Sequence, residues 1–374
     1  RFKEFDGDWN SIAIGKFLKI KSGLGFKAEE YSTEQEIRLL QIENVGYGAV
    51  KWTHNVKFVP TNYLDVHKDL VLKEGDLVLA LNRPVTNDQL KIAKLTQEDS
   101  PSILYQRVGK LDFLKEDIDK EFIFQIFKKD VKNYVLNSSI GSDQPFISTT
   151  DLYKHKLCIP LKEEQTKIAS FLSAVDEKIS QLTQKHELLS QYKQGMMQKL
   201  FSQQLRFKAD DGSEFGEWEN SYIGNECKIT TGNKDTQNKV DDGLYPFFVR
   251  SQTVEKINSY SMDCEAILTS GDGVGVGKNY HYMNGKFDFH QRVYCLYEFS
   301  ERLIGRYLYI YFSNYFYDRV KRLSAKNSVD SVRMDMISKM EIKLPCLEEQ
   351  TKIANFLSAI DQKIEVVAQQ IEQA

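Results

Sequence analysis

"EEQTKIASFLSAVDEKI" (Glu163–Ile179) and "EEQTKIANFLSAIDQKI" (Glu348–Ile364) are two copies of one segment in a chain of 374 residues. Each copy follows a proline by three residues, and its two glutamates suit the positive N-terminal end of a helix dipole. Hydrophobic residues then recur at alternating spacings of four and three, which predicts a coiled-coil seam. The predicted seam residues are Ile168, Leu172, Val175, Ile179, Leu182, Leu189 and Met196 in the first copy, and Ile353, Leu357, Ile360, Ile364, Val367 and Ile371 in the second.

Two polar residues, His186 and Lys193, also fall on the predicted seam. They fit either a partly exposed seam or control of its register by polar side chains. A second helix that pairs with the first must run back along it, because the first helix leads the chain into the next globular segment. The pair is therefore predicted to be antiparallel, with two similar domains related by a pseudo-two-fold axis.

The repeat extends beyond the helices, as a search for internal periodicity should test first. "QRV" occurs at Gln106–Val108 and again, at the same offset, at Gln291–Val293. "EFDGDWNSIAIG" near the start resembles "EFGEWENSYIG" at 214–224. The predicted domains are globular segments at 1–157 and 206–342, and helical segments at 158–205 and 343–374.

The globular segments are predicted to be α+β, a mixed α/β fold. Short β-rich runs predict strands at "KFVP" (57–60), "DLVLAL" (76–81), "FIFQIF" (122–127), "EAILTS" (265–270) and "RVYCLYEF" (292–299). The aromatic stretch at 303–323 has helical spacing, and we interpret its rings as core.

Composition places few limits on function. The net charge is −3, so bulk charge favours neither nucleic acid nor membrane. The five cysteines are scattered without metal-ligand spacing and are interpreted as free thiols in a reducing cytoplasm. There is no signal peptide and no apolar run long enough to cross a bilayer. The chain begins at Arg1, and Ala374 aligns with Leu189, so we expect further residues in the natural protein.

A glycine-rich loop, "TSGDGVGVGKNY" at 269–280, follows a predicted strand. Its glycines allow close approach, and its amides and lysine suit a phosphate, although an ordinary glycine turn fits as well. It is not a Walker A loop, because Asp272 and Asn279 stand where glycine and Ser or Thr are required. The candidate binding residues here are Gly271, Asp272, Gly273, Val274, Gly275, Gly277 and Lys278, with Asn82 and Arg83 at the same place in the first repeat.

A Gln–Arg pair follows each loop, at Gln106–Arg107 and Gln291–Arg292. Gln can bind adenine and Arg can bind guanine through two hydrogen bonds, but a pair present in both repeats also fits fold support or phosphate contact. The basic stretch 318–333 adds Lys326, Asn327 and Arg333 as candidates, with a solvated helix face as the alternative.

No motif for nucleophilic or metal-dependent catalysis is present: the histidines are isolated, and there is no H-E-x-x-H or amino-methylating motif. An enzyme that acts alone is therefore not expected.

These features together resemble the specificity subunit of type I restriction–modification systems. The resemblance rests on the twin helices, on "YKQGMMQKLF" at 192–201, on the "F(D)G(D/E)W" motif that opens each globular half, and on "GDGVGVGK" in the second half. It implies two target recognition domains, each binding half of a bipartite site in double-stranded DNA. It also implies that the helices set the gap and dock two methylation subunits.

By the same resemblance, no cofactor binds this chain. S-adenosylmethionine is expected on the methylation subunits, and ATP and Mg²⁺ on two restriction subunits. The subunit itself would be non-catalytic and cytoplasmic. Two other hypotheses remain: a coiled-coil interaction scaffold that never meets DNA, and a DNA-modifying enzyme, against which the missing motifs count.

Overall fold

The computed structural model describes residues 1–138, 146–273, 275–323 and 331–374. It divides into two compact units, Arg1–Lys178 and Ile179–Ala374, each with its own hydrophobic core. The division lies inside one long helix, α4 (Lys162–Phe201), which contributes to both units. The domain boundaries predicted above stay predictions.

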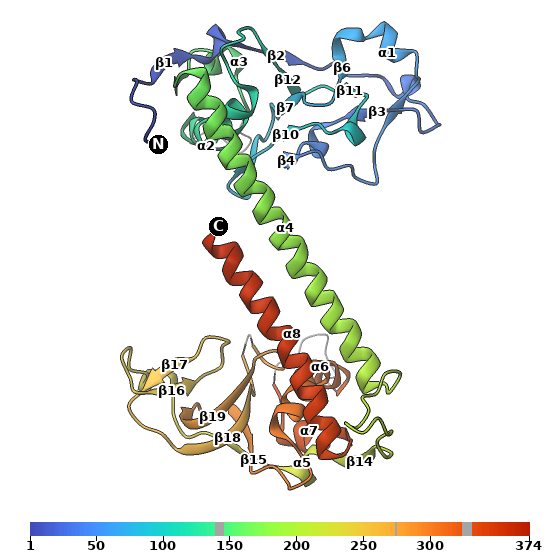
Figure 1. Cartoon of the computed structure of the whole chain (residues 1–374), viewed down its shortest axis with the longest axis vertical. Coiled ribbons are helices and arrows are strands. Elements are labelled where there is room, and N and C mark those ends of the chain that lie inside the picture. Colours follow the sequence, from blue (N-terminus) through green and yellow to red (C-terminus); the bar gives the residue numbers. More distant parts are fainter. Residues whose placement is uncertain (139–145, 274, 324–330) are drawn as a thin grey trace. The chain divides into compact units, whose positions relative to one another are not determined.

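The first unit contains a five-stranded sheet of order β2-β12-β7-β10-β4 and a four-stranded sheet of order β5-β3-β11-β6 (Figure 1). Its strands are β1 (Asn10–Ala13), β2 (Leu18–Ser22), β3 (Ile37–Leu40), β4 (Tyr47–Ala49), β5 (Phe58–Val59), β6 (Val71–Leu72), β7 (Leu77–Ala80), β8 (Val85–Thr86), β9 (Gln89–Leu90), β10 (Ile92–Lys94), β11 (Ser102–Leu104), β12 (Val108–Phe113) and β13 (Lys156–Ile159). Its helices before α4 are α1 (Tyr63–Val66), α2 (Lys120–Ser138) and α3 (Thr149–Leu152).

The second unit has one six-stranded sheet of order β15-β20-β18-β19-β16-β17. Its strands are β14 (Glu219–Tyr222), β15 (Lys228–Thr231), β16 (Tyr245–Phe248), β17 (Glu255–Ile257), β18 (Met262–Ser270), β19 (Tyr280–Phe289), β20 (Val293–Tyr297) and β21 (Glu341–Leu344). Its helices after α4 are α5 (Ile223–Glu226), α6 (Gly305–Leu323), α7 (Met334–Ser338) and α8 (Leu347–Gln373). Helices and sheets thus occur in both units, which confirms the mixed α/β fold.

Each unit closes on itself through a pair of antiparallel strands. β1 pairs with β13, and β14 pairs with β21 in the same way. The second strand of each pair leads directly into a long helix, α4 or α8. The chain that enters a unit is therefore hydrogen-bonded to the chain that leaves it.

The second glutamate of each repeated motif is buried and fastens its helix to its own unit. Glu349 accepts hydrogen bonds from Arg206 (Nε 3.0 Å, Nη2 2.7 Å) and from the indole N–H of Trp218 (2.9 Å). Glu164 accepts the matching bonds from Arg1 (2.9 and 3.0 Å) and Trp9 (3.3 Å). The helix-dipole interpretation of these glutamates is therefore incomplete: the first of each pair is exposed, and the second is an internal anchor.

The glutamine that follows is also buried, and its side chain forms hydrogen bonds with backbone groups outside the strands. Gln350 donates to the carbonyls of Pro345 (2.9 Å) and Arg302 (2.7 Å) and accepts from the amide of Ile304 (2.8 Å). Gln165 makes the corresponding three bonds in the first unit, at 2.9, 3.1 and 2.9 Å. The residues common to both repeats thus join helix and globular segment.

One predicted strand is wrong: "FIFQIF" (122–127) lies inside α2, not in a sheet. A short apolar run cannot by itself distinguish a strand from a buried helix. Phe127, Val131 and Val135 continue the buried face at helical spacing, and α2 and α6 are both 19 residues long. The predicted helix at 303–323 is confirmed as α6, and Tyr307, Phe312 and Phe316 lie fully buried in the core.

The end of α4 packs antiparallel on α8 within the second unit. Lys193 forms an ion pair with Asp361 (2.5 Å), and Leu189 and Lys185 lie near Val366 and Gln370, further along α8. Met197, Leu200 and Phe201 of α4 share one core with Ile353, Leu357 and Ile360 of α8. Leu357 is therefore fully buried, whereas Leu172, its counterpart at the start of α4, is 38% exposed.

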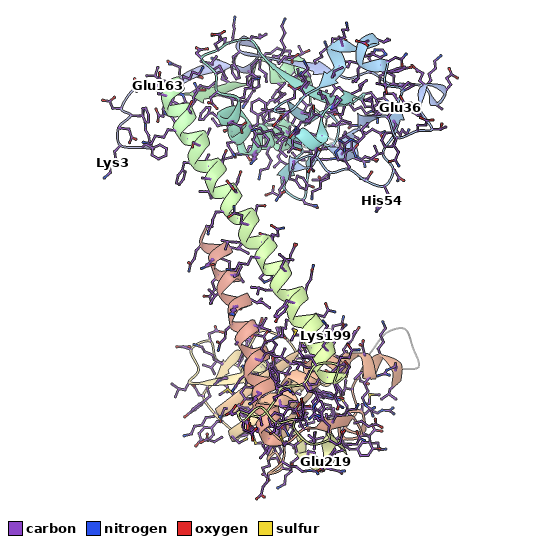
Figure 2. All side chains as sticks on the ribbon, turned by 45° about the vertical axis from the view of Figure 1, so that its right-hand side comes forward. Lys3, Glu36, His54, Glu163, Lys199 and Glu219 are labelled. Atoms are coloured by element: carbon purple, nitrogen blue, oxygen red, sulfur yellow. The ribbon has the colours of Figure 1, made fainter. Side chains whose placement is uncertain are left out.

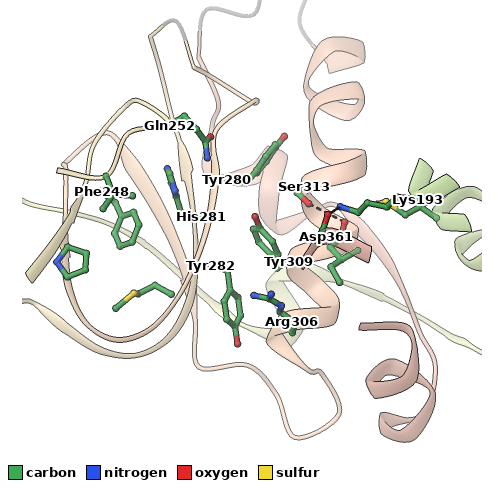
Figure 3. A pocket seen from close by; sticks show the side chains of 15 residues that line it. Lys193, Phe248, Gln252, Tyr280, His281, Tyr282, Arg306, Tyr309, Ser313 and Asp361 are labelled. Carbon is green, nitrogen blue, oxygen red and sulfur yellow. Dashed lines mark hydrogen bonds and ion pairs between the residues drawn. The ribbon is translucent and has the colours of Figure 1, made fainter. Parts of the chain in front are cut away.

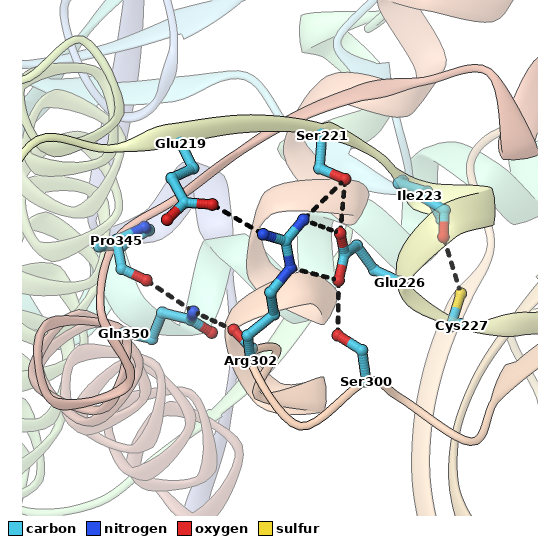
Figure 4. A network of polar contacts seen from close by, with 9 residues as sticks. All are labelled: Glu219, Ser221, Ile223, Glu226, Cys227, Ser300, Arg302, Pro345 and Gln350. Carbon is cyan, nitrogen blue, oxygen red and sulfur yellow. Dashed lines mark hydrogen bonds and ion pairs between the residues drawn. The ribbon is translucent and has the colours of Figure 1, made fainter.

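A polar network surrounds α5, the short helix that follows β14 (Figure 4). Glu226 is buried and accepts hydrogen bonds from Arg302 (2.5 Å), Ser221 (2.5 Å) and Ser300 (2.5 Å). Arg302 also reaches Glu219 (2.7 Å). The bonds from Arg302 do most to lower the pKa of Glu226 to about 2, the two serines lower it further, and burial opposes them.

We expect Glu349→Ala to lower the free energy of unfolding of the second unit by about 3–5 kcal/mol, because it leaves the partly buried Arg206 charge without its partner. Glu348→Ala is the matched control: its side chain is exposed, so its effect should stay within about 0.5 kcal/mol. Urea denaturation followed by circular dichroism measures both. Equal losses in the two variants would contradict the anchoring role.

The pKa of Glu226 predicts how stability depends on pH. A carboxyl whose pKa is lower in the folded state stabilises the fold above its unfolded pKa and loses this effect as the pH falls toward the folded value. We expect Glu226→Gln to cost about 2 kcal/mol at neutral pH, allowing for solvent screening of the half-exposed Arg302. This difference from the native chain should shrink as the pH falls from about 5 to about 2. Thermal unfolding across that range tests it, and a constant difference would refute it.

Candidate nucleic-acid interface

Three segments that are far apart in sequence meet at one end of the large sheet in the second unit. They are the loop after β18, the turn between β19 and β20, and the residues before α7. The amide of Gly271 donates to the carbonyl of Arg292 (2.7 Å), and the amide of Val332 donates to the carbonyl of Gly271 (2.7 Å). Asp272 and Ser331 form an isolated bridge beside them. The backbone thus holds the glycine loop and the Gln–Arg turn side by side.

The first unit builds the same arrangement from different residues. The amide of Leu81 donates to the carbonyl of Arg107 (2.9 Å), and the amide of Ile147 donates to the carbonyl of Leu81 (2.8 Å). Asn82 and Phe146 form the isolated bridge. Asn82 therefore occupies the place that Asp272 occupies in the second unit, which the sequence alignment alone left approximate.

The structure brings most of the predicted binding residues together within each unit. Asn82 is half-buried, and the exposed candidates are Arg83, Gln106, Arg107, Gly273, Lys278, Gln291, Arg292 and Arg333. Gly271 and Gly277 are buried, and Asp272 and Gly275 are half-buried. Val274, Lys326 and Asn327 lie outside the described residues.

Asp272 lies between two arginines. Its carboxylate accepts a hydrogen bond from Arg250 Nη1 (3.1 Å) and lies 3.7 Å from Arg292 Nε. Asp272 therefore links the two guanidinium groups at this end of the sheet.

A second carboxylate orients the neighbouring glutamine. Gln291 donates to Asp235 (3.2 Å), and the amide of Gln291 donates to the carbonyl of Lys234 (2.8 Å). His290 is buried, and its Nδ1 accepts from the amide of Arg292 (2.9 Å). Burial and the nearby Arg250 charge lower the pKa of His290, and the bond at its Nδ1 fixes the turn.

Several backbone amides of the glycine loop donate hydrogen bonds to carbonyls of the same loop. The amides of Val276, Lys278 and Asn279 donate to carbonyls of Gly273 and Gly275. These three amides are used within the loop and are not free to bind a phosphate. The side chain of Lys278 is exposed, with its Nζ 5.1 Å from the centre of the Tyr317 ring.

Two glycines are required by this loop geometry. Gly273 has φ +83°, which disfavours other residues. A Cβ on Gly275 would lie 1.8 Å from the side-chain nitrogen of Asn279. That nitrogen donates to the carbonyl of Arg250 and to Ser270 (both 3.3 Å), so the loop also positions Arg250.

An open cavity of about 610 Å³ lies elsewhere in the second unit, between the sheet, α6 and the end of α4 (Figure 3). Its labelled side chains include Tyr280, Tyr282, Tyr309 and Arg306. Arg306 lies over the Tyr282 ring (4.6 Å), and the Tyr282 hydroxyl donates to Glu265 (2.6 Å). These polar groups are paired with one another, so the cavity offers aromatic faces, not a catalytic arrangement.

The predicted seam residues differ in burial between the two helices. α4 has an acidic first turn at Glu163 and a basic last turn at Lys199, both marked in Figure 2. Ile353, Leu357, Ile360, Val367 and Leu182 are buried; Ile168, Val175, Ile179, Leu189, Met196, Ile364 and Ile371 are half-buried; and Leu172 is exposed. Ile168 packs on the core of the first unit. Of the two polar seam residues, Lys193 has a partner on α8 in Asp361, which favours register control over fraying at that position.

Among the residues that the structure describes, no group of His, Cys, Asp and Glu could hold a metal ion. No described helix is long and apolar enough to span a membrane. The five cysteines are free thiols in the structure, and burial raises the pKa of Cys227 to about 12.

Sequence reasoning missed Arg250, Asp235 and Lys234. None lies in a repeated motif, and each reaches the site only because β16 and the segment after β15 end beside the β19–β20 turn. The isolated β-bridge between Lys234 and His290 depends on the order of strands in the sheet, which cannot be inferred from the sequence.

The sequence matches a known protein family and several of its members. The model of the family described as type I restriction modification DNA specificity domain matches residues 6–191 and 216–374. The MjaVIII specificity subunit of Methanocaldococcus jannaschii is 38% identical over 210 residues, which are 55% of this chain and 48% of that protein. The EcoAI specificity subunit of Escherichia coli is 28% identical over 180 residues, 47% of this chain and 29% of that protein. The matched region thus spans about half or less of these relatives.

Solved structures share the fold. The S subunit of a type I restriction–modification system from M. genitalium aligns with a TM-score of 0.70 at 14% identity, over 100% of this chain and 94% of that one. A chain from a structure on complex assembly and conformational transition of the type I R-M system aligns with a TM-score of 0.51 at 18% identity, over 99% of this chain and 94% of that one. At these identities the similarity is one of fold.

The glycine loop gives a local test. We expect Gly275→Ala to displace Asn279 and to speed hydrogen exchange at the amides of Val276, Lys278 and Asn279, because the added Cβ has no room. Gly216→Ala is the control, since nothing lies within 4 Å of its Cβ. Unchanged exchange in the loop would show that the backbone absorbs the clash.

Proposed function

The chain belongs to the family of type I restriction modification DNA specificity domains, and on that premise we propose that it reads a bipartite site in double-stranded DNA. Residues 1–157 bind one half-site and residues 206–342 bind the other, as two target recognition domains. The helical segments 158–205 and 343–374 hold the two halves at a fixed gap. The chain is the non-catalytic specificity subunit of a larger DNA adenine methyltransferase and restriction enzyme.

One observation supports this function above the others: both units use the same backbone frame and the same Gln–Arg pair, but place a different side chain at one position between them. The frame joins a strand end, a Gln–Arg turn and a segment before a short helix. At one position of this frame stands Asn82 in the first unit and Asp272 in the second. A common frame with different side chains is what two half-sites of different sequence require, because phosphate contacts position a protein and base contacts specify the sequence.

The side chains on the frame suit DNA. Arginine matches the acceptors of guanine, and asparagine or glutamine matches adenine, each through two hydrogen bonds in the major groove. Lys278, exposed beside the loop, suits a phosphate. The net charge of −3 does not oppose this function, because Arg250, Lys278 and Arg292 supply positive charge locally.

Catalysis then belongs to partner subunits. We propose that two methylation subunits dock on the helical segments and bind S-adenosylmethionine, and that two restriction subunits bring ATP and Mg²⁺ in the complete cytoplasmic enzyme. Leu188, Tyr192 and Val366 support the helices as a docking surface, because these large apolar side chains are more than half exposed.

The decisive experiment is a methylation map. We expect co-expression of the full protein with its methylation subunit to modify adenine in a two-part motif with a fixed gap, detected by sequencing host DNA for modified bases. Replacing residues 1–157 with the segment of another family member should change one half of the motif and leave the other intact. A stable complex that binds the methyl donor but modifies no motif would favour the interaction scaffold instead.

A further inference from the structure

We propose that Arg250 and Arg292, held by Asp272, form a guanine-reading pair in the half-site bound by residues 206–342. This inference rests on the proposed function and assigns that function to particular side chains. Arg250 lies outside every motif of the sequence and joins the site only through the fold.

The arginines are fixed at their backbones and free at their tips. The carbonyl of Arg250 accepts from the buried Asn279 (3.3 Å), and Arg292 is held through His290 Nδ1 at its amide and Gly271 at its carbonyl. Their side chains are 44% and 66% exposed. Both therefore extend from a rigid base toward solvent.

Asp272 orients the two guanidinium groups but leaves most of their N–H donors free. It contacts one nitrogen of each guanidinium, Nη1 of Arg250 at 3.1 Å and Nε of Arg292 at 3.7 Å. A guanidinium has five N–H donors, so each arginine keeps a fork for two further acceptors. The O6 and N7 atoms of guanine are such a pair of acceptors.

The carboxylate also indicates base reading over phosphate contact. A phosphate needs positive charge, and an aspartate beside the arginines weakens that attraction. Reading a base requires a guanidinium in a fixed orientation. Asp272 limits the rotamers of each arginine before DNA binds, so less side-chain entropy is lost on binding. The first unit has Asn82 at this place, so Arg107, the counterpart of Arg292, lacks the equivalent carboxylate.

The test uses the complex with the methylation subunit, once the methylation map has given the motif. Binding is measured for duplexes in which each base pair of the second half-site is replaced in turn. We expect the native complex to prefer G·C at two positions, one for each arginine, by about tenfold to a hundredfold. Arg250→Ala and Arg292→Ala should each abolish the preference at one of these positions and leave the first half-site unchanged.

Two further variants separate orientation from charge. Arg250→Lys keeps the charge and loses the fork, so it should retain affinity for other duplexes but lose the G·C preference. Asp272→Asn should weaken the preference in the native background and add little in the Arg250→Ala background, because the residues act together.

Lys228→Ala is the matched control. Lys228 is ion-paired to Glu298 (2.5 Å) and lies at the far end of the same β15–β20 strand pair. It should change neither half-site. Thermal unfolding of each complex confirms that the variants are folded.

The outcomes are distinct. A uniform loss of affinity for every duplex in Arg250→Ala and Arg292→Ala would show phosphate contact and overturn the inference, as would an unchanged half-site in both. A native complex without any bipartite motif would overturn the proposed function itself.

Discussion

The buried carboxylate at the start of each long helix is the contact on which each unit depends. Glu349 is fully buried with its charge, and such burial is tolerated only with close partners. Arg206 and Trp218 supply these partners from the start of the globular segment that follows α4. Since these residues precede the sheet and Glu349 follows it, the pairing closes the globular segment around its own core.

This closure explains why the repeated motif includes the Glu–Gln pair, which a coiled-coil seam alone does not require. The glutamine after each glutamate satisfies three backbone groups, including one that belongs to the residues just before α6 in the second unit. The helix start therefore also fixes where the globular segment begins its largest helix. A buried polar residue whose hydrogen bonds are all made specifies one arrangement of its neighbours, whereas apolar seam residues can pack in several arrangements.

Within the closed unit, backbone hydrogen bonds determine the position of the candidate site, and side chains determine its chemistry. Gly271 bonds both to the Gln–Arg turn and to the segment before α7, so the frame does not depend on which side chain follows. Asp272 can then vary without loss of the frame, and Asn82 shows one such variant. Charge is arranged locally: one carboxylate serves two arginines and a second serves a glutamine.

The sequence by itself determined the tandem repeat, the two long helices and the mixed α/β class, because repetition and helical periodicity are local signals. The candidate binding positions it suggested stay predictions. It misplaced 122–127 in a strand, since a short apolar run has no period that separates the alternatives. Only the tertiary structure decided that the second glutamate is an anchor, that three loop amides bond within the loop, and that Arg250 joins Arg292 at Asp272. These facts depend on sheet order and on burial, which arise from contacts between residues far apart in the chain.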